Sequence, residues 1–475
     1  MTAEATGQVR SATLSVAAQL GAKVAHLALN VVSTLAIVRY FAPGAYGTYV
    51  LVLTVTTLAG VVADFGLPKL AVREMVRPGA DEGGVAGTVI AIRLALAVVA
   101  VLGCQGVLAL FGQPPAAHLA AAIASLVIVG EAVVGVLVVA FQIRLVQQYE
   151  ATLRVAGEAI ETALVLVLVV RGAPLPWFFV PPAVGIAVAL AGAIVLTRRR
   201  YALRPRVVVA QLRPLLREAL PLGPALLVGV LYLKLDSFVV AALRPPRDLG
   251  IYGAAAQPVE YLFLATAVIM NVLFPLLAQA WAASEPERFL ALYRRGTELL
   301  VIVTAFVAAT AVFIAPALVR VAFGPAYRGA AAPLAVLSVA LVAMTVNAWQ
   351  SLVLLAGGHQ RVVLRYNLVA LGVAVVLCGV LVHGVGPVGA AVSVLATGVF
   401  VLGASTRAVR ARMGATLDGR RVGSVGLAAL AAAAVAGALT VAGVPWLVVV
   451  VAAALPYAAV LGRFRFHRTI REAFA

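Results

Sequence analysis

Long apolar segments dominate the chain. Fourteen apolar windows of roughly 17–29 residues, each long enough to cross a bilayer as a helix, alternate with short stretches rich in Gly, Pro or charge. We predict membrane-spanning helices over residues 12–38, 44–64, 85–111, 118–143, 155–171, 176–197, 219–243, 250–278, 296–319, 333–356, 362–383, 387–406, 424–442 and 444–462. The pattern therefore predicts an all-α polytopic membrane protein.

The composition agrees with this fold class. Of the 475 residues, 63% are hydrophobic and 11% are charged, whereas soluble domains carry about 25% charged residues. A water-soluble globular protein is thereby excluded, and little sequence remains for a separate catalytic domain. The two cysteines, Cys104 and Cys378, lie within apolar runs and lack metal-ligand spacing. We accordingly expect no disulfide framework, no metal, no cofactor and no catalytic residue.

The basic residues predict the orientation in the membrane. The net charge is +18. If the N-terminus is cytoplasmic, 27 of the 36 Lys and Arg residues fall in cytoplasmic segments, six on the opposite side and three within spans. The positive-inside rule explains this asymmetry, so we expect no nucleic acid as a partner. Both termini are predicted to be cytoplasmic. The first helix, which follows Arg10, is expected to be retained and not cleaved as a signal peptide.

Two basic segments divide the chain. The first runs from Arg198 to Arg217 and follows six spans, and the second runs from Arg407 to Arg421 and precedes the last two. We predict five parts, which are a six-helix lobe (1–200), a basic cytoplasmic linker (201–217), a second six-helix lobe (218–406), a basic cytoplasmic loop (407–423) and an extra helix pair with a basic tail (424–475).

A short motif recurs in the two predicted lobes. Residues 43–49 read PGAYGTY and residues 246–252 read PRDLGIY, so that Pro, Gly and Tyr coincide at an offset of 203 residues. Because six spans separate the copies, both halves would enter the membrane in the same sense. The sequence therefore predicts two lobes related by a pseudo-two-fold axis along the membrane normal, as in transporters that bind substrate between their repeats.

Four segments carry a family resemblance. They are residues 39–47 (RYFAPGAYG), 64–67 (DFGL), 323–334 (FGPAYRGAAAPL) and 386–391 (GPVGAA). In order and spacing, over roughly residues 10–410, the chain resembles the Wzx-type polysaccharide and O-antigen flippases of the multidrug/oligosaccharidyl-lipid/polysaccharide (MOP) exporter superfamily. The resemblance implies a MATE-like fold, with two six-helix lobes around a central cavity that opens alternately to either side.

The same resemblance implies a function and a setting. The substrate would be an undecaprenyl-diphosphate-linked oligosaccharide, flipped across the cytoplasmic (inner) membrane of a bacterium for the biosynthesis of surface polysaccharide such as the O-antigen of lipopolysaccharide. The expected partners are this lipid-linked oligosaccharide, the lipid bilayer, and polysaccharide polymerase and chain-length proteins. We expect a monomer. The identity of the glycan does not follow from the resemblance.

Polar residues within the predicted spans are the candidates for substrate binding, because a charge within hydrocarbon requires an explanation. Lys23, His26 and Asn30 share one face of the first helix with Ser33. The alternative for Lys23 is a structural ion pair with an acid such as Glu158 or Glu260. The full set of substrate-binding candidates is Lys23, His26, Asn30, Arg93, Lys234, Asn271 and Trp349.

Buried acids are the candidates for binding a coupling ion. They are Glu131, Glu158, Asp236 and Glu260. The alternative, weighted equally, is that these acids neutralise buried basic residues. Arg93 lies close enough to a span end to snorkel, and Asp64 borders a loop, where it would be solvated.

Three other functions remain open. A lipid II flippase of the same superfamily also has fourteen spans and a basic cavity. A multidrug or cation antiporter would be expected to carry a carboxylate on its first helix where this chain has Lys23. A membrane-embedded polysaccharide polymerase needs catalytic residues in sizeable external loops, and the short loops predicted here carry neither paired carboxylates nor a His cluster. We therefore expect a transporter and not an enzyme, with a cavity lined by the first, second, seventh and eighth helices.

Overall fold

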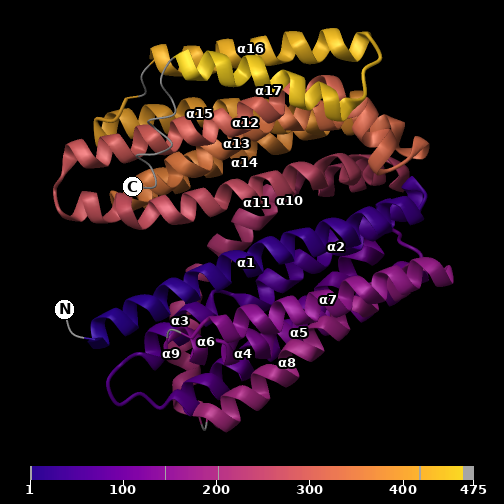
Figure 1. The fold of residues 1–475 in the computed structure, drawn as a ribbon. Helices are drawn as coiled ribbons and strands as arrows, with labels where there is room; N and C mark the ends of the chain where they lie inside the picture. The colour runs from indigo at the N-terminus through magenta and orange to yellow at the C-terminus, as the bar shows by residue number, and fades with distance from the viewer. Residues whose placement is uncertain (1–2, 145, 202, 417–418, 464–475) are drawn as a thin grey trace. The chain divides into compact units, whose positions relative to one another are not determined.

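The structure, a computed structural model, describes residues 3–144, 146–201, 203–416 and 419–463, and these residues form helices and connecting loops without a β-strand (Figure 1). Every predicted window corresponds to a long helix. These helices are α1 (Ala3–Tyr40), α2 (Pro43–Asp64), α4 (Glu82–Leu110), α5 (Pro115–Leu137), α7 (Gln148–Arg171), α8 (Val180–Tyr201), α10 (Leu222–Leu243), α11 (Pro246–Ala282), α12 (Pro286–Ala322), α13 (Ala331–Ala356), α14 (Gln360–Val385), α15 (Pro387–Met413), α16 (Gly419–Val441) and α17 (Trp446–Arg463).

Short helices lie between the long ones. They are α3 (Leu67–Met75), α6 (Val139–Gln142), α9 (Val209–Ala219) and the two 3₁₀ helices η1 (Leu175–Phe179) and η2 (Pro325–Ala330). The hydrophobic pattern included α6 and most of η1 in the predicted spans 118–143 and 176–197. It did not predict α3, α9 or η2, because each has too few apolar residues to cross a membrane.

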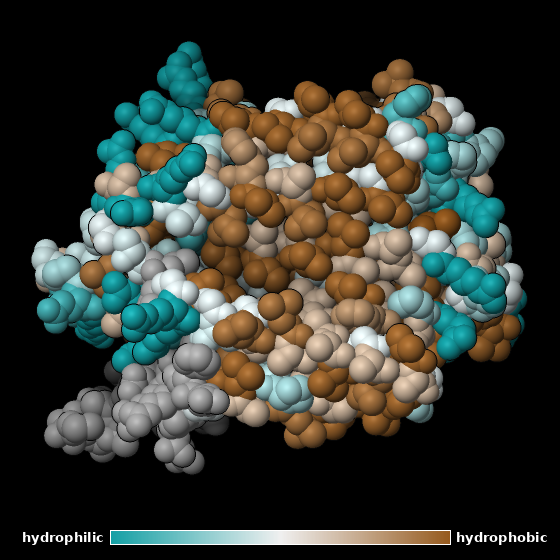
Figure 2. All heavy atoms as spheres, turned by 90° about the horizontal axis from the view of Figure 1, so that it is seen from above, coloured by the Kyte–Doolittle hydropathy of each residue, from teal (hydrophilic) through white to brown (hydrophobic). Residues whose placement is uncertain are grey.

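Within the described residues, eleven helices are long and apolar enough to cross a membrane, and two shorter apolar segments, Val24–Tyr40 and Trp446–Gly462, accompany them. Helix α7 has 24 residues and carries the charged residues Glu150, Arg154, Glu158 and Glu161, all of them before residue 162. Figure 2 shows a face on which hydrophobic residues form a broad band between hydrophilic residues at two opposite edges. The chain is therefore a multi-pass membrane protein.

The chain forms two compact units, Met1–Lys234 and Leu235–Ala475. Several corresponding helix pairs pack in both units. In the first unit, α2 packs on α4 and α5, α4 packs on α5, and α8 packs on α5 and α7. In the second, α11 packs on α12 and α13, α12 packs on α13, and α15 packs on α13 and α14. This shared packing pattern supports the repeat inferred from the 203-residue offset. The predicted boundaries of the five parts stay predictions.

The predicted cytoplasmic linker packs onto the first unit. The backbone N–H of Arg206 donates to the carbonyl of Gly83 over 2.9 Å, and the N–H of Val208 donates to Thr88 Oγ1 over 2.9 Å. A Cβ at Gly87 would lie 2.3 Å from the Arg206 nitrogen, so glycine permits this close approach. Asp81 accepts from the N–H of Gly84 and from the Arg206 guanidinium, which lowers the pKa of Asp81.

The C-terminal pair α16 and α17 packs against α12. Ile302 and Ile314 of α12 form an apolar cluster with buried residues of the pair, among them Val425 and Val449. Tyr457 donates a hydrogen bond to the carbonyl of Ile302. At the start of α16, Arg421 donates to both carboxylate oxygens of Glu298 over 3.1 and 2.9 Å.

We predict that Arg421→Ala lowers the free energy of unfolding by about 1–2 kcal/mol. The Glu298 carboxylate, only 8% exposed, would lose the guanidinium nitrogen that donates to both of its oxygens. The effect is modest because the Arg421 side chain is itself half exposed. The effect would be measured as a lower unfolding temperature in detergent. Arg412→Ala, at an exposed position at the end of α15, is the control and should leave the temperature unchanged. Equal stability of both variants would show that this ion pair does not anchor α16.

Candidate functional site

The polar stripe of the first helix contacts α7. The imidazole of His26 forms an ion pair with the carboxylate of Glu158, and Asn30 Nδ2 donates to the same carboxylate oxygen over 3.4 Å. Further along, the Ser33 hydroxyl donates to Thr162 over 3.0 Å. The stripe therefore packs against a second polar helix. Glu158, predicted as an ion-coupling residue or as a partner for Lys23, is paired with His26.

The side chain of Lys23 lies outside the described residues, although its backbone belongs to α1. Its role as a substrate-binding cation stays a prediction. Lys23 precedes His26 by one helical turn, so its backbone places it on the face that packs against α7.

Arg93 does not snorkel to the membrane surface. Its side chain is 4% exposed and forms a 2.9 Å ion pair with Asp64, whose carboxylate is 40% exposed, in keeping with its predicted place beside a loop. A second guanidinium nitrogen donates to the carbonyl of Ala132 on α5 over 3.2 Å. A Cβ at Gly135 would lie 2.5 Å from the guanidinium, so this glycine makes room for it. Arg93 thus joins α2, α4 and α5.

A cavity of about 260 Å³ lies beside Arg93 in the first unit. Its polar lining includes Thr56, Thr57 and Glu131. Glu131, another predicted ion-coupling residue, accepts from the Arg154 guanidinium over 3.0 Å. The described part of this cavity therefore contains both an acid and a base, and each has an intramolecular partner.

In the second unit, Asp236 lies at the contact between α10 and α11. One carboxylate oxygen accepts from the backbone N–H of Ser237 over 2.8 Å, and the other accepts from the hydroxyl of the fully buried Tyr252. Tyr252 is the tyrosine of the repeated motif, which explains its place there. Tyr252 was not predicted as a functional residue from the sequence, although its place in the repeated motif could have drawn attention to it.

The remaining polar candidates lie on the same two helices. Lys234 is partly buried on α10, while Glu260 and Asn271 occupy exposed positions on α11. Their predicted roles in substrate binding and ion coupling stay predictions.

Trp349 lies in the core of the second unit. Its side chain is 0% exposed, and its indole N–H donates to the carbonyl of Tyr293 over 3.3 Å. A Cβ at Gly296 would lie 2.5 Å from the indole ring, so α12 packs directly on it. The neighbouring Gln350 donates to Thr406 of α15 over 3.1 Å. In this conformation Trp349 is a packing residue between α12 and α13, and a role in binding sugar stays a prediction.

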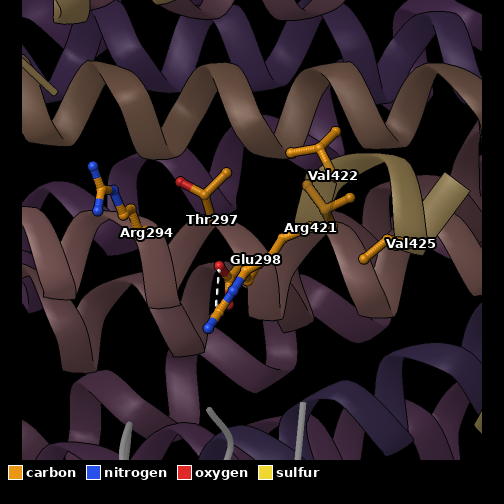
Figure 3. Close-up of a pocket in the computed structure, with 7 residues that line it drawn as sticks. Arg294, Thr297, Glu298, Arg421, Val422 and Val425 are labelled. Atoms are coloured by element: carbon orange, nitrogen blue, oxygen red, sulfur yellow. Dashed lines mark hydrogen bonds and ion pairs between the residues drawn. The ribbon is translucent and has the colours of Figure 1, made fainter. Parts of the chain in front are cut away.

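An apolar groove of about 610 Å³ runs between α12, α13 and α16. Small and branched apolar residues line it, including Ala305, Val312, Val339, Gly426 and Leu430. At one end of α16 lies a much smaller pocket, in which Arg421 points at Glu298 while Arg294 points away from them (Figure 3). Its volume of about 10 Å³ is the minimum for a single water. The groove is therefore the feature that could hold a chain of methyl and methylene groups.

The described residues contain no group of three or more His, Cys, Asp and Glu side chains that could hold a metal ion. Cys104 and Cys378 are buried and unpaired, the first in α4 and the second in α14.

A family model described as "Polysaccharide biosynthesis protein" matches residues 13–281. No curated protein sequence matches the chain.

Solved structures share the fold. The lipid II flippase MurJ, in an inward closed conformation, matches with a TM-score of 0.78 at 13% identity, over 96% of this chain and 100% of the flippase. An inward-facing multidrug resistance MATE transporter of the MOP superfamily matches with a TM-score of 0.65 at 14% identity, over 81% and 94%. The Vibrio cholerae MATE transporter VcmN matches with a TM-score of 0.56 at 14% identity, over 86% and 98%. At these identities the likeness concerns the fold.

Proposed function

Because the chain belongs to the polysaccharide biosynthesis protein family and has the fold of the MOP transporters, we propose that it flips an undecaprenyl-diphosphate-linked oligosaccharide across the bacterial cytoplasmic membrane. The observation that carries this proposal is the family match over residues 13–281. Transport by alternating access would move the lipid to the outer leaflet without breaking a covalent bond, so no catalytic residue is required.

The chemistry of such a substrate explains two features of the chain. A diphosphate is an anion and needs compensating positive charge to cross hydrocarbon, and Lys23 and Lys234 are basic residues within predicted spans. A polyprenyl chain is apolar, and the groove between α12, α13 and α16 offers about 610 Å³ of apolar space. Arg93 is a weaker candidate for the diphosphate because its guanidinium is already bound to Asp64.

The setting follows from the same proposal. Surface polysaccharide, including O-antigen, would be the end product, with a polymerase and chain-length proteins acting after the flippase. The positive-inside asymmetry supports cytoplasmic N- and C-termini. We propose a monomer as the transporting unit.

A lipid II flippase is the second candidate. The match to MurJ covers 100% of that chain and 96% of this one, which includes helices beyond residue 281, where the family match ends. Lipid II has the same diphosphate and the same kind of polyprenyl tail, so the two candidates differ in the glycan. A multidrug antiporter is a third possibility within the superfamily, with a lower TM-score of 0.65.

The experiment that separates these candidates is a translocation assay with the full chain in vesicles of bacterial phospholipid. Three fluorescent probes are compared, which are an undecaprenyl-diphosphate oligosaccharide, lipid II and a cationic dye. We expect the chain to bring the first probe within reach of an external quencher much faster than protein-free vesicles do. Equal or faster movement of lipid II would favour the second candidate, and movement of the dye alone would favour the third.

Lys23→Ala should slow this translocation about 30-fold or more, because a buried charge pair with the diphosphate is lost. Lys23→Arg should keep part of the rate, since the charge remains while the donor geometry changes. Both rates would be normalised to the amount of protein in the vesicles. If Lys23 only pairs with an acid, Lys23→Ala should instead lower expression or stability. Combination with Glu158→Gln or Glu260→Gln would then restore transport, and such a rescue would refute the substrate-binding role.

A further inference from the structure

The contact between α1 and α7 gathers ionisable groups within the first unit. His26 pairs with Glu158, and Asn30 donates to the same carboxylate oxygen over 3.4 Å. The second oxygen of Glu158 is buried and has no hydrogen-bond partner among the side chains that the structure describes. A buried carboxylate oxygen without a donor costs free energy. This contact between α1 and α7 is therefore a candidate for a role beyond packing.

The positive charge of Arg154 is already shared. Arg154 lies one turn before Glu158 on α7, and its guanidinium donates to Glu131 over 3.0 Å and to Glu150 over 3.3 Å. Among the side chains that the structure describes here, the His26 imidazole is the group left to compensate the negative charge of the Glu158 carboxylate. Lys23 stands one turn before His26, and its side chain lies outside the described part.

A second carboxylate follows Glu158 by one turn. Glu161 is partly buried and lies on the same face of α7, three residues on. Helix α8 passes very close at this level, because a Cβ at Gly157 would lie 2.6 Å from the carbonyl of Gly185. A Cβ at Gly185 would in turn lie 3.5 Å from a Glu161 carboxylate oxygen. Helix α8 offers Glu161 no ionisable side chain before its last turn, since residues 180–197 contain none.

Two partly buried carboxylates one turn apart, with one imidazole beside them, cannot both stay ionised at low cost. We propose that His26, Glu158 and Glu161 form a proton-binding site, in which His26 and Glu158 remain paired and Glu161 takes up and releases the proton. The proton comes from water, binds one Glu161 carboxylate oxygen to give the neutral acid, and returns to water when the site opens again. No other bond changes.

The site suits a proton better than a metal cation. The described donors to Glu158 are N–H groups of His26 and Asn30, and a protonated imidazole repels a metal ion. Sodium or a divalent cation would need several oxygen ligands converging on one point. The existence of the site does not depend on which lipid is moved, and only its use in coupling rests on the proposed function.

The first test measures the proton without any substrate. The full chain, purified in lipid, is titrated from about pH 8 to about pH 6, and the infrared absorption of protonated carboxyl groups is recorded. We expect a carboxyl signal that Glu161→Gln removes. Glu82→Gln is the matched control, since it neutralises a partly exposed glutamate that pairs with Arg144 elsewhere in the first unit. Its signal should equal that of the wild type.

Several results would overturn the proposal. They are the absence of the signal in the wild type, its persistence in Glu161→Gln, or its displacement by sodium at constant pH, the last of which would assign the site to a metal cation. If Glu161→Gln does not fold, Glu161→Asp keeps a carboxyl group at a shorter reach. The signal should then shift in pH, and an unchanged titration would exclude Glu161.

The second test concerns coupling. A gradient of about one pH unit can change the translocation rate of the lipid-linked probe by up to about tenfold if one proton is coupled. Glu161→Gln should reduce this dependence to less than about twofold, whereas Glu82→Gln should keep it. If no lipid is moved by the wild type, the proposed function fails while the infrared result still stands. If transport occurs and both variants respond equally to the gradient, the coupling role of the site is refuted.

Discussion

Replacing Arg93 with alanine is expected to lower the free energy of unfolding by about 2–3 kcal/mol, mainly through the cavity and the lost hydrogen bonds, because the Asp64 carboxylate is 40% exposed and can be hydrated. The guanidinium is 4% exposed and joins three helices through Asp64 on α2 and the carbonyl of Ala132 on α5. Its loss leaves the Asp64 carboxylate without its cation and opens a cavity beside Gly135. The unfolding temperature of the purified protein would measure the effect. Arg144→Ala is the control, because the Arg144–Glu82 pair is partly exposed and contributes less than about 1 kcal/mol.

A double variant separates packing from substrate binding at this position. Arg93→Met with Asp64→Asn replaces the ion pair by neutral groups of similar size, and such replacements are often neutral for stability. We expect the double variant to regain most of the lost unfolding temperature. If it also regains transport, Arg93 has a structural role. If it is stable but inactive, the guanidinium takes part in transport, as the sequence analysis predicted. An Arg93→Ala protein as stable as the wild type would refute the structural role.

Replacing Trp349 with alanine is expected to destabilise the second unit by about 3–5 kcal/mol. The indole is 0% exposed, fills the space that Gly296 leaves open on α12, and donates to the carbonyl of Tyr293. Truncation would leave a cavity and remove one hydrogen bond, while the Tyr293 carbonyl would still accept from the Thr297 hydroxyl over 2.8 Å. The unfolding temperature in detergent would report the loss. Trp177→Ala, at a position that is 54% exposed, should cost less than about 1 kcal/mol.

Trp349→Phe tests the predicted contact with sugar. Phenylalanine keeps most of the packing and loses the N–H, so stability should fall far less than in the alanine variant. If Trp349 serves only in core packing, we expect the folded Trp349→Phe protein to translocate the probe at the normal rate. A stable Trp349→Phe protein that no longer moves the lipid-linked probe would show that the indole contacts the substrate in another conformation.

The number and approximate limits of the long helices could be predicted from the sequence. A helix in a bilayer satisfies its own backbone hydrogen bonds and needs only a sufficient run of apolar side chains, and both requirements are local. For the same reason the predicted windows correspond to α1, α2 and each later long helix. The short amphipathic helix α9 could not be found in this way. It is stable because Leu215 and Ala219 pack on residues near α3, more than a hundred positions earlier in the chain.

The repeated motif predicted part of the tertiary structure but not its side-chain contacts. Pro, Gly and Tyr at an offset of 203 residues predicted two similar halves, and several corresponding helix pairs pack in both units. The motif did not reveal the contact of Tyr252 with Asp236. That contact depends on how α11 packs beside α10, which no spacing along one helix determines.

The sequence by itself determined that this is a helical membrane protein, and its motifs pointed to the flippase family. Which charges lie within spans was also evident from the sequence, because hydropathy is a property of each segment. Only the tertiary structure decided what those charges contact. Arg93 binds Asp64, Glu158 binds His26, and Glu131 binds Arg154. The physical reason is that an ion pair within a membrane forms between facing helices, and which faces meet is decided by the packing of the whole unit.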